Sequence, residues 1–103
     1  MINLAENTKA EFAEISIQQN NLVSTNGGVP HINIPVVSPY GIATMPPKGE
    51  RVVVLPTGNT AVCLGTPQKN NNLEEGELML FSSGGASIVL KNDGKVLING
   101  KEM

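Results

Sequence analysis

Three short apolar triplets near the C-terminus constrain the fold of this 103-residue chain more than any other feature. They are Leu78-Met79-Leu80, Ile88-Val89-Leu90 and Val96-Leu97-Ile98, and the last two repeat at a spacing of eight residues. Glycine turns follow the triplets, at Gly84-Gly85, Asp93-Gly94 and Asn99-Gly100. Short apolar runs bounded by such turns predict β-strands, and a fixed period predicts a stacked or wound β architecture.

The middle residue of each triplet carries the second constraint. Neighbouring side chains of a strand point to opposite faces, so Met79, Val89 and Leu97 face away from their flanking partners. The other face then carries six aliphatic side chains: Leu78, Leu80, Ile88, Leu90, Val96 and Ile98. The segment is too short to bury two apolar faces by itself. We therefore expect these nine residues to form the interface and core of an assembly, with Gly84, Gly85, Gly94 and Gly100 making its turns.

The composition favours self-association. Only 16% of the residues are charged, against roughly 25% in an average domain, and the chain has two Phe, one Tyr and no Trp. A small chain buries little apolar surface when it folds alone, and oligomerisation is one way to gain the missing core. The formal net charge is −2 and no cluster of Lys and Arg occurs, which disfavours nucleic-acid binding.

The rest of the chain predicts further strands and no helix. Residues 11–18 alternate polar and apolar, residues 51–56 form a continuous apolar run, and residues 60–65 follow them after a tight hairpin. Residues 29–37 alternate between two prolines, which is typical of an edge strand. Residues 19–21 and 26–28 are expected to be a loop and a turn.

These segments predict an all-β fold with five strands in residues 11–81, which suits a small OB-like barrel. Residues 1–10 are expected to be a flexible N-terminal arm. Residues 82–103 are expected to form a short β-helix stub that projects from the barrel. No signal peptide or membrane-spanning run is recognisable, so we expect synthesis as a soluble cytoplasmic product.

Catalytic chemistry is not indicated. A nucleophile needs a nearby base, but the one histidine, His31, lies in a proline-bounded segment and Cys63 lies within an apolar run. The pair Glu74-Glu75 reads as a solvated turn, and Asp93-Gly94 lacks the other acidic positions of a calcium loop. One Cys and one His cannot make a zinc site. We expect no enzyme activity, no metal and no cofactor.

An ordered set of short motifs resembles a known family. The set runs through Pro39-Tyr40-Gly41, Pro46-Pro47-Lys48-Gly49-Glu50, Val52-Val53-Val54-Leu55-Pro56, Leu64-Gly65, Gly76-Glu77 with the first triplet, and the stretch 85–98. It is similar to the central-spike proteins of contractile phage baseplates, in particular the Mu-type baseplate group that also serves phage-like bacteriocins and related injection machines. The similarity covers roughly residues 36–100.

The resemblance implies a structural protein of the virion or of a phage-tail-like particle. It implies synthesis in the bacterial cytoplasm and assembly into the baseplate as a homotrimer whose OB-like domain sits on the baseplate hub protein. The C-terminal strands of the three chains, residues 82–103, would intertwine into a rigid needle segment that meets the target-cell envelope transiently. Family spikes often end in a His-x-His apex that binds a metal, whereas the one histidine here is His31. The resemblance therefore implies a blunt tip or a separate tip-capping protein.

A different class of function stays open at this point. A small β-rich carbohydrate-binding or adhesion module has the same general composition. Its weakness is that no aromatic cluster is available to stack on sugars, because Phe12, Tyr40 and Phe81 are the only aromatic residues.

Overall fold

The computed structural model describes residues 9–68 and 72–103, which divide into an N-terminal unit (Met1–Pro67) and a C-terminal unit (Gln68–Met103). Each unit contains one antiparallel sheet, and no described residue is helical. The all-β prediction is therefore confirmed. Within the described ranges there is also no helix with the length and apolarity that crossing a membrane requires. Most of the expected N-terminal arm, residues 1–8, lies outside the described residues.

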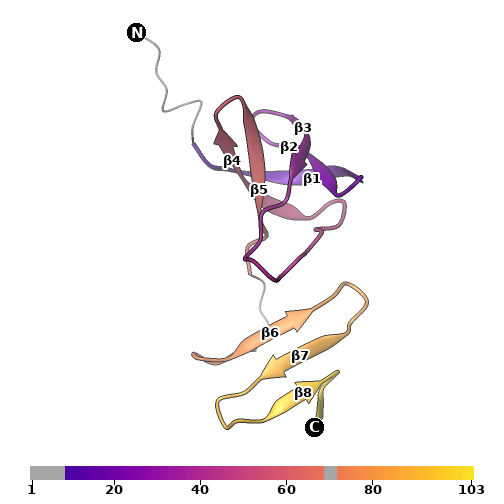
Figure 1. Ribbon diagram of the computed structural model, residues 1–103, viewed down its shortest axis with the longest axis vertical. Coiled ribbons are helices and arrows are strands. Elements are labelled where there is room, and N and C mark those ends of the chain that lie inside the picture. Colours follow the sequence, from indigo (N-terminus) through magenta and orange to yellow (C-terminus); the bar gives the residue numbers. More distant parts are fainter. Residues whose placement is uncertain (1–8, 69–71) are drawn as a thin grey trace. The chain divides into compact units, whose positions relative to one another are not determined.

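The sheet of the N-terminal unit has five strands in the order β3-β2-β1-β4-β5 (Figure 1). The strands are β1 (Glu11–Gln19), β2 (Leu22–Asn26), β3 (His31–Pro35), β4 (Arg51–Thr57) and β5 (Thr60–Gly65). Antiparallel hairpins join β1 to β2, β2 to β3, and β4 to β5. The strand β1 pairs with both β2 and β4, so it lies at the centre of the sheet.

The strand β2 was not expected from the sequence. It follows a two-residue turn in which Asn20 and Asn21 both have positive φ angles, of 54° and 64°. Two consecutive left-handed residues define the type I′ turn, which matches the twist of a β-hairpin, and asparagine tolerates this conformation better than most residues. The asparagine pair therefore leads directly into a strand.

The core of the N-terminal unit comes from alternate positions of its strands. Ala13 and Ile15 of β1, Val52 and Val54 of β4, and Ala61 and Cys63 of β5 are all buried, together with Val23 and Ile34. Val36 and Met45 are partly buried and pack against this cluster. The core is purely aliphatic apart from the thiol of Cys63, in keeping with the low aromatic content.

Two irregularities on either side of Ser24 bend the sheet. The pairing of β1 with β2 shifts between Ile15 and Ile17, so β1 holds one extra residue. The pairing of β2 with β3 shifts between Val23 and Thr25, so β3 holds one extra residue. Bulges of this kind increase strand twist. The two edges of the sheet meet at one parallel bridge between Val36 and Cys63, where the Val37 N–H donates to the Cys63 carbonyl at 2.8 Å. The bridge does not extend into a strand ladder, so the sheet is not closed.

The C-terminal unit is a four-stranded meander in the order β6-β7-β8-β9, of which Figure 1 labels the first three strands. Its strands are β6 (Leu78–Phe81), β7 (Ser87–Leu90), β8 (Val96–Ile98) and β9 (Lys101–Glu102). The expected boundary after residue 81 was wrong, because β6 pairs with β7 and the units divide between Pro67 and Gln68. The first triplet thus pairs with the other two in the second sheet. The fifth strand of the first sheet is β2 and not, as expected, the segment that contains the first triplet.

The turns of the meander explain most of the expected glycines. Ser82 N–H donates to the Ala86 carbonyl at 3.0 Å, and Lys91 N–H donates to the Lys95 carbonyl at 2.9 Å, so each pair closes a three-residue loop. The last residue of each loop is a glycine with positive φ, Gly85 at 96° and Gly94 at 88°. A left-handed residue at this position is typical of three-residue hairpin loops.

The remaining two glycines differ from each other. Gly100, with φ of 81°, forms a two-residue turn with Asn99, whose φ is 52°. This turn leads into β9, which was not expected from the sequence. Gly84 does not have a positive φ angle, so its backbone conformation does not require glycine.

Candidate functional site: the two faces of the C-terminal sheet

The register of the C-terminal sheet gathers six aliphatic side chains on one face. Leu78 lies opposite Leu90, which lies opposite Val96. Two residues further along each strand, and so on the same face, Leu80 lies opposite Ile88, which lies opposite Ile98. We call this set the aliphatic face, and its members are Leu78, Leu80, Ile88, Leu90, Val96 and Ile98. Within β6, β7 and β8 the face contains no ionisable residue; Lys101, opposite Ile98, lies at its rim on β9.

The opposite face of the sheet mixes apolar and charged residues. Met79, Val89 and Leu97 form one row across β6, β7 and β8, and Glu102 of β9 extends this row. By strand alternation, Glu77, Lys91 and Lys95 lie on the same face beside that row. Phe81 and Ser87 form a third row. We call this side of the sheet the mixed face.

The aliphatic residues of the two faces differ in how far the chain covers them, although Phe81 at the end of the mixed face is 67% exposed. On the aliphatic face, Leu78, Leu80, Ile88, Leu90 and Ile98 remain between 40% and 48% exposed. Met79, Val89 and Leu97 on the mixed face are all partly buried, beside the long side chains of lysine and glutamate. No described apolar residue of the C-terminal unit is fully buried. The unit therefore has strands and turns but no interior of its own.

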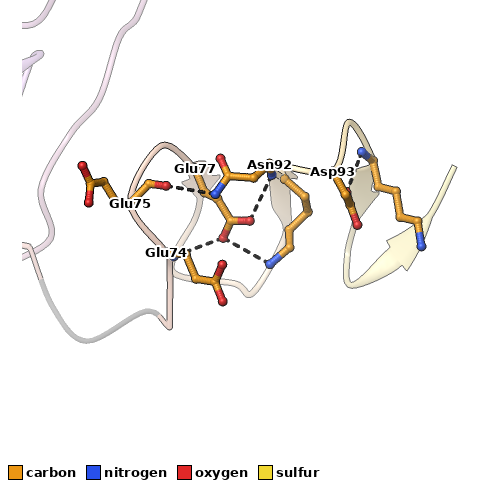
Figure 2. A network of polar contacts seen from close by, with 7 residues as sticks. Glu74, Glu75, Glu77, Asn92 and Asp93 are labelled. Atoms are coloured by element: carbon orange, nitrogen blue, oxygen red, sulfur yellow. Dashed lines mark hydrogen bonds and ion pairs between the residues drawn. The ribbon is translucent and has the colours of Figure 1, made fainter.

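A polar cluster, which we call the Glu77 clasp, fastens the start of the sheet (Figure 2). Glu77 Oε1 accepts hydrogen bonds from the Glu74 N–H and from Lys91 Nζ, both at 3.1 Å, and Oε2 accepts one from the Asn92 N–H at 3.1 Å. The Asn92 side-chain amide donates to the Glu75 carbonyl at 2.9 Å. The clasp thus joins the turn before β6 to the turn between β7 and β8.

The electrostatics of the clasp follow from these bonds. Only 2% of the Glu77 side chain is exposed, and its neighbours in the two turns provide the cover. Hydrogen bonds from the Asn92 and Glu74 N–H groups, with a smaller contribution from Lys91, hold the pKa of Glu77 below its usual range. Desolvation acts in the opposite direction but does not outweigh them. Glu77 is therefore ionised at neutral pH.

A second polar contact fastens the opposite end of the sheet. Asn99 N–H donates to the Ser87 carbonyl at 2.9 Å, and Ser87 N–H donates to Asn99 Oδ1 at 2.9 Å. The asparagine of the last turn thus satisfies the first residue of β7. With the Glu77 clasp at one end and Asn99 at the other, the strand ends are held by specific bonds although the sheet has no core.

The residues considered for catalysis are not brought together. His31 begins β3, and no hydrogen bond joins it to a hydroxyl group in the described part of the chain. Burial raises the pKa of the Cys63 thiol, and its contact with the Gly65 backbone only partly offsets this. Glu74 and Glu75 lie in an exposed turn. The described residues contain no group of three or more His, Cys, Asp or Glu placed to hold a metal ion.

Sequence reasoning missed the Glu77 clasp. Glu77 comes directly before the first triplet, Lys91 directly after the second and Lys95 directly before the third. Once the triplets are paired in an antiparallel register, Lys91 lies between Glu77 and Lys95, and its neighbour of opposite charge is Glu77. The signal was therefore present, but reading it requires the register.

Comparison with known proteins finds no matching family model and no matching curated relative.

Proposed function

We propose that this chain is a structural component of the central spike of a contractile phage tail or a phage-tail-like injection particle, and that it acts as a homotrimer. The observation that carries the proposal is the C-terminal sheet, which presents apolar side chains on both faces and fully buries no described apolar residue. A sheet with these properties needs further protein to become stable.

The energetics support association. A small sheet needs an apolar face packed against other structure for independent stability. Burying a Leu, Ile or Val side chain completely contributes about 1.5–3 kcal/mol, so covering a side chain that is already half buried contributes about 1 kcal/mol. The six residues of the aliphatic face occur in every copy. Three copies would together add enough apolar burial to make the trimer essentially obligate.

The N-terminal unit fits the proposed attachment domain. Its strand order β3-β2-β1-β4-β5, with a parallel contact between the ends of the order, matches the connectivity of a partly open OB-like barrel. Its own core of eight buried apolar residues contains no residue of the needle segment. We propose that this unit sits on the baseplate hub protein.

The proposed role is mechanical. A spike transmits the force of sheath contraction to the target-cell envelope, so it has to resist bending. Short strands with tight turns, fastened at one end by Glu77 and at the other by Asn99, support such rigidity. Residues 72–103 contain no histidine, so they supply no metal-bound apex.

Particle morphology tests this function. The gene should lie beside genes for sheath, tube and baseplate wedge, and particles from a deletion strain should lack central density below the baseplate in negative-stain images. They should also fail to inject or to kill. Fully active particles with an unchanged baseplate would contradict the proposal. A monomeric protein that binds an oligosaccharide would instead favour the adhesion module.

A further inference from the structure

We infer that the aliphatic faces of three copies pack against one another around the trimer axis, and that the mixed face points to solvent. This inference rests on the proposed trimer and adds to it the orientation of each sheet. The position of the charged residues in the strand register carries it.

Burying the mixed face would remove three charged side chains per copy from water, those of Lys91, Lys95 and Glu102, because Glu77 is already covered. Glu77 and Lys91 form an ion pair at 3.1 Å, and Lys95 and Glu102 form a looser one at 3.7 Å, both on that face. The Lys91 side chain is 32% exposed, and those of Lys95 and Glu102 are 53% and 56% exposed. Taking charged groups out of water is costly even when they are paired, and their attraction often fails to offset that cost. Hence the charges favour a solvent-facing mixed face.

Burying the aliphatic face carries no such cost. Its six positions on β6, β7 and β8 hold only Leu, Ile and Val. Lys101 lies at the rim on the outer strand β9, where a long side chain can keep its ammonium group in water. The same face also keeps the largest uncovered aliphatic area in the C-terminal unit, with five of its residues at least 40% exposed.

Further copies of the same chain are the occupants that suit this face. A surface that is aliphatic and free of charge over three strands has no group to specify a polar partner, and an identical surface matches it in chemistry. Two-row faces of this kind interdigitate when sheets pack about 10 Å apart. Every added copy brings one such face, so three sheets around an axis leave none uncovered.

Two neighbouring residues of β7 provide a matched test. Ile88 lies on the aliphatic face and Val89 on the mixed face. Each is one position from an end of β7. The full-length variants Ile88→Asp and Val89→Asp are compared by light scattering coupled to size exclusion. We expect Ile88→Asp to lose the trimer and Val89→Asp to keep it. The reverse result, or loss of the trimer in both variants, would overturn the inference.

Cysteine accessibility gives a second readout with a milder change. The variants Ile88→Cys and Val89→Cys are reacted with a thiol reagent under native conditions, with Cys63 as the internal reference because it is buried. At position 88 the thiol should react more than about tenfold more slowly than at position 89, since reaction requires the trimer to open. Equal rates in a trimeric protein would overturn the inference while leaving the proposed function standing. A monomeric wild type would overturn both.

Discussion

Glu77 Oε1 and Lys91 Nζ lie 3.1 Å apart across the β6–β7 pair, on the face of the sheet opposite Leu78 and Leu90. The ion pair and the two leucines therefore lie on opposite faces of the same two strands, and the two faces differ in chemistry. On one side charged groups are satisfied within the chain, and on the other an aliphatic layer is left uncovered. This division connects the local bonding of the sheet to its proposed assembly.

Replacing Glu77 with glutamine should destabilise the C-terminal unit. An amide nitrogen would take the place of one carboxylate oxygen and confront an N–H or ammonium donor, and the ion pair with Lys91 would be lost. Thermal unfolding followed by circular dichroism should show a lower midpoint. Glu75→Gln is the matched control, because Glu75 enters the clasp through its backbone carbonyl and should leave the midpoint unchanged.

The same carboxylate should make the stability of the C-terminal unit depend on pH. The pKa of Glu77 is lowered from its ordinary value of 4.5, so the folded state binds the proton less readily than the unfolded state. Its stabilising contribution is then fully present above the ordinary value and is lost as pH falls through the lowered pKa. Unfolding midpoints of wild type and Glu77→Gln should converge in that acidic range. A constant difference down to the lowest pH would contradict this account.

Substituting alanine for Gly94 should cost about 1–2 kcal/mol, because its φ of 88° is a left-handed conformation that a Cβ atom disfavours. The steric surroundings are open, so the cost is conformational. Gly85→Ala, at φ of 96°, should behave in the same way. Gly84→Ala in the same loop is the control and should be nearly neutral, which denaturant titration can measure.

Two neighbouring hydroxyl groups in β2 should respond with opposite signs. Thr25 Oγ1 is buried and makes no hydrogen bond to any described residue, so Thr25→Val should raise the free energy of unfolding by about 1 kcal/mol. Ser24 Oγ accepts a hydrogen bond from the Asn33 N–H at 3.1 Å. Ser24→Ala should therefore lower that free energy by about 1–2 kcal/mol. Urea unfolding of both variants provides the test, and effects of the same sign would count against it.

The sequence was most informative where apolar residues and glycines recur together. The three triplets correspond to β6, β7 and β8, and their middle residues share one row of the sheet. Residues 51–56 and 60–65 correspond closely to β4 and β5. In these segments the local pattern and the turn chemistry favour the same structure. The strands and their faces could therefore be predicted without knowledge of distant contacts.

The features that were missed depend on conformation or on register. β2 follows two left-handed asparagines, and β9 follows the Asn99-Gly100 turn, but both strands are short and neither has strong alternation. The unit boundary was misplaced because the sequence between Gly65 and Leu78 does not show which sheet the next strand joins. The Glu77 clasp brings together residues that are far apart in sequence, and only the antiparallel register makes them neighbours.

The mass of the wild-type protein in solution tests the central claim most directly. Sedimentation equilibrium or light scattering on the full chain at micromolar concentration should give three times the chain mass of 10.8 kDa, without dissociation on dilution. Such a result is expected if two further copies cover the aliphatic face. A stable, well-behaved monomer of 10.8 kDa would contradict the account, because the C-terminal sheet would then persist with its aliphatic face in water.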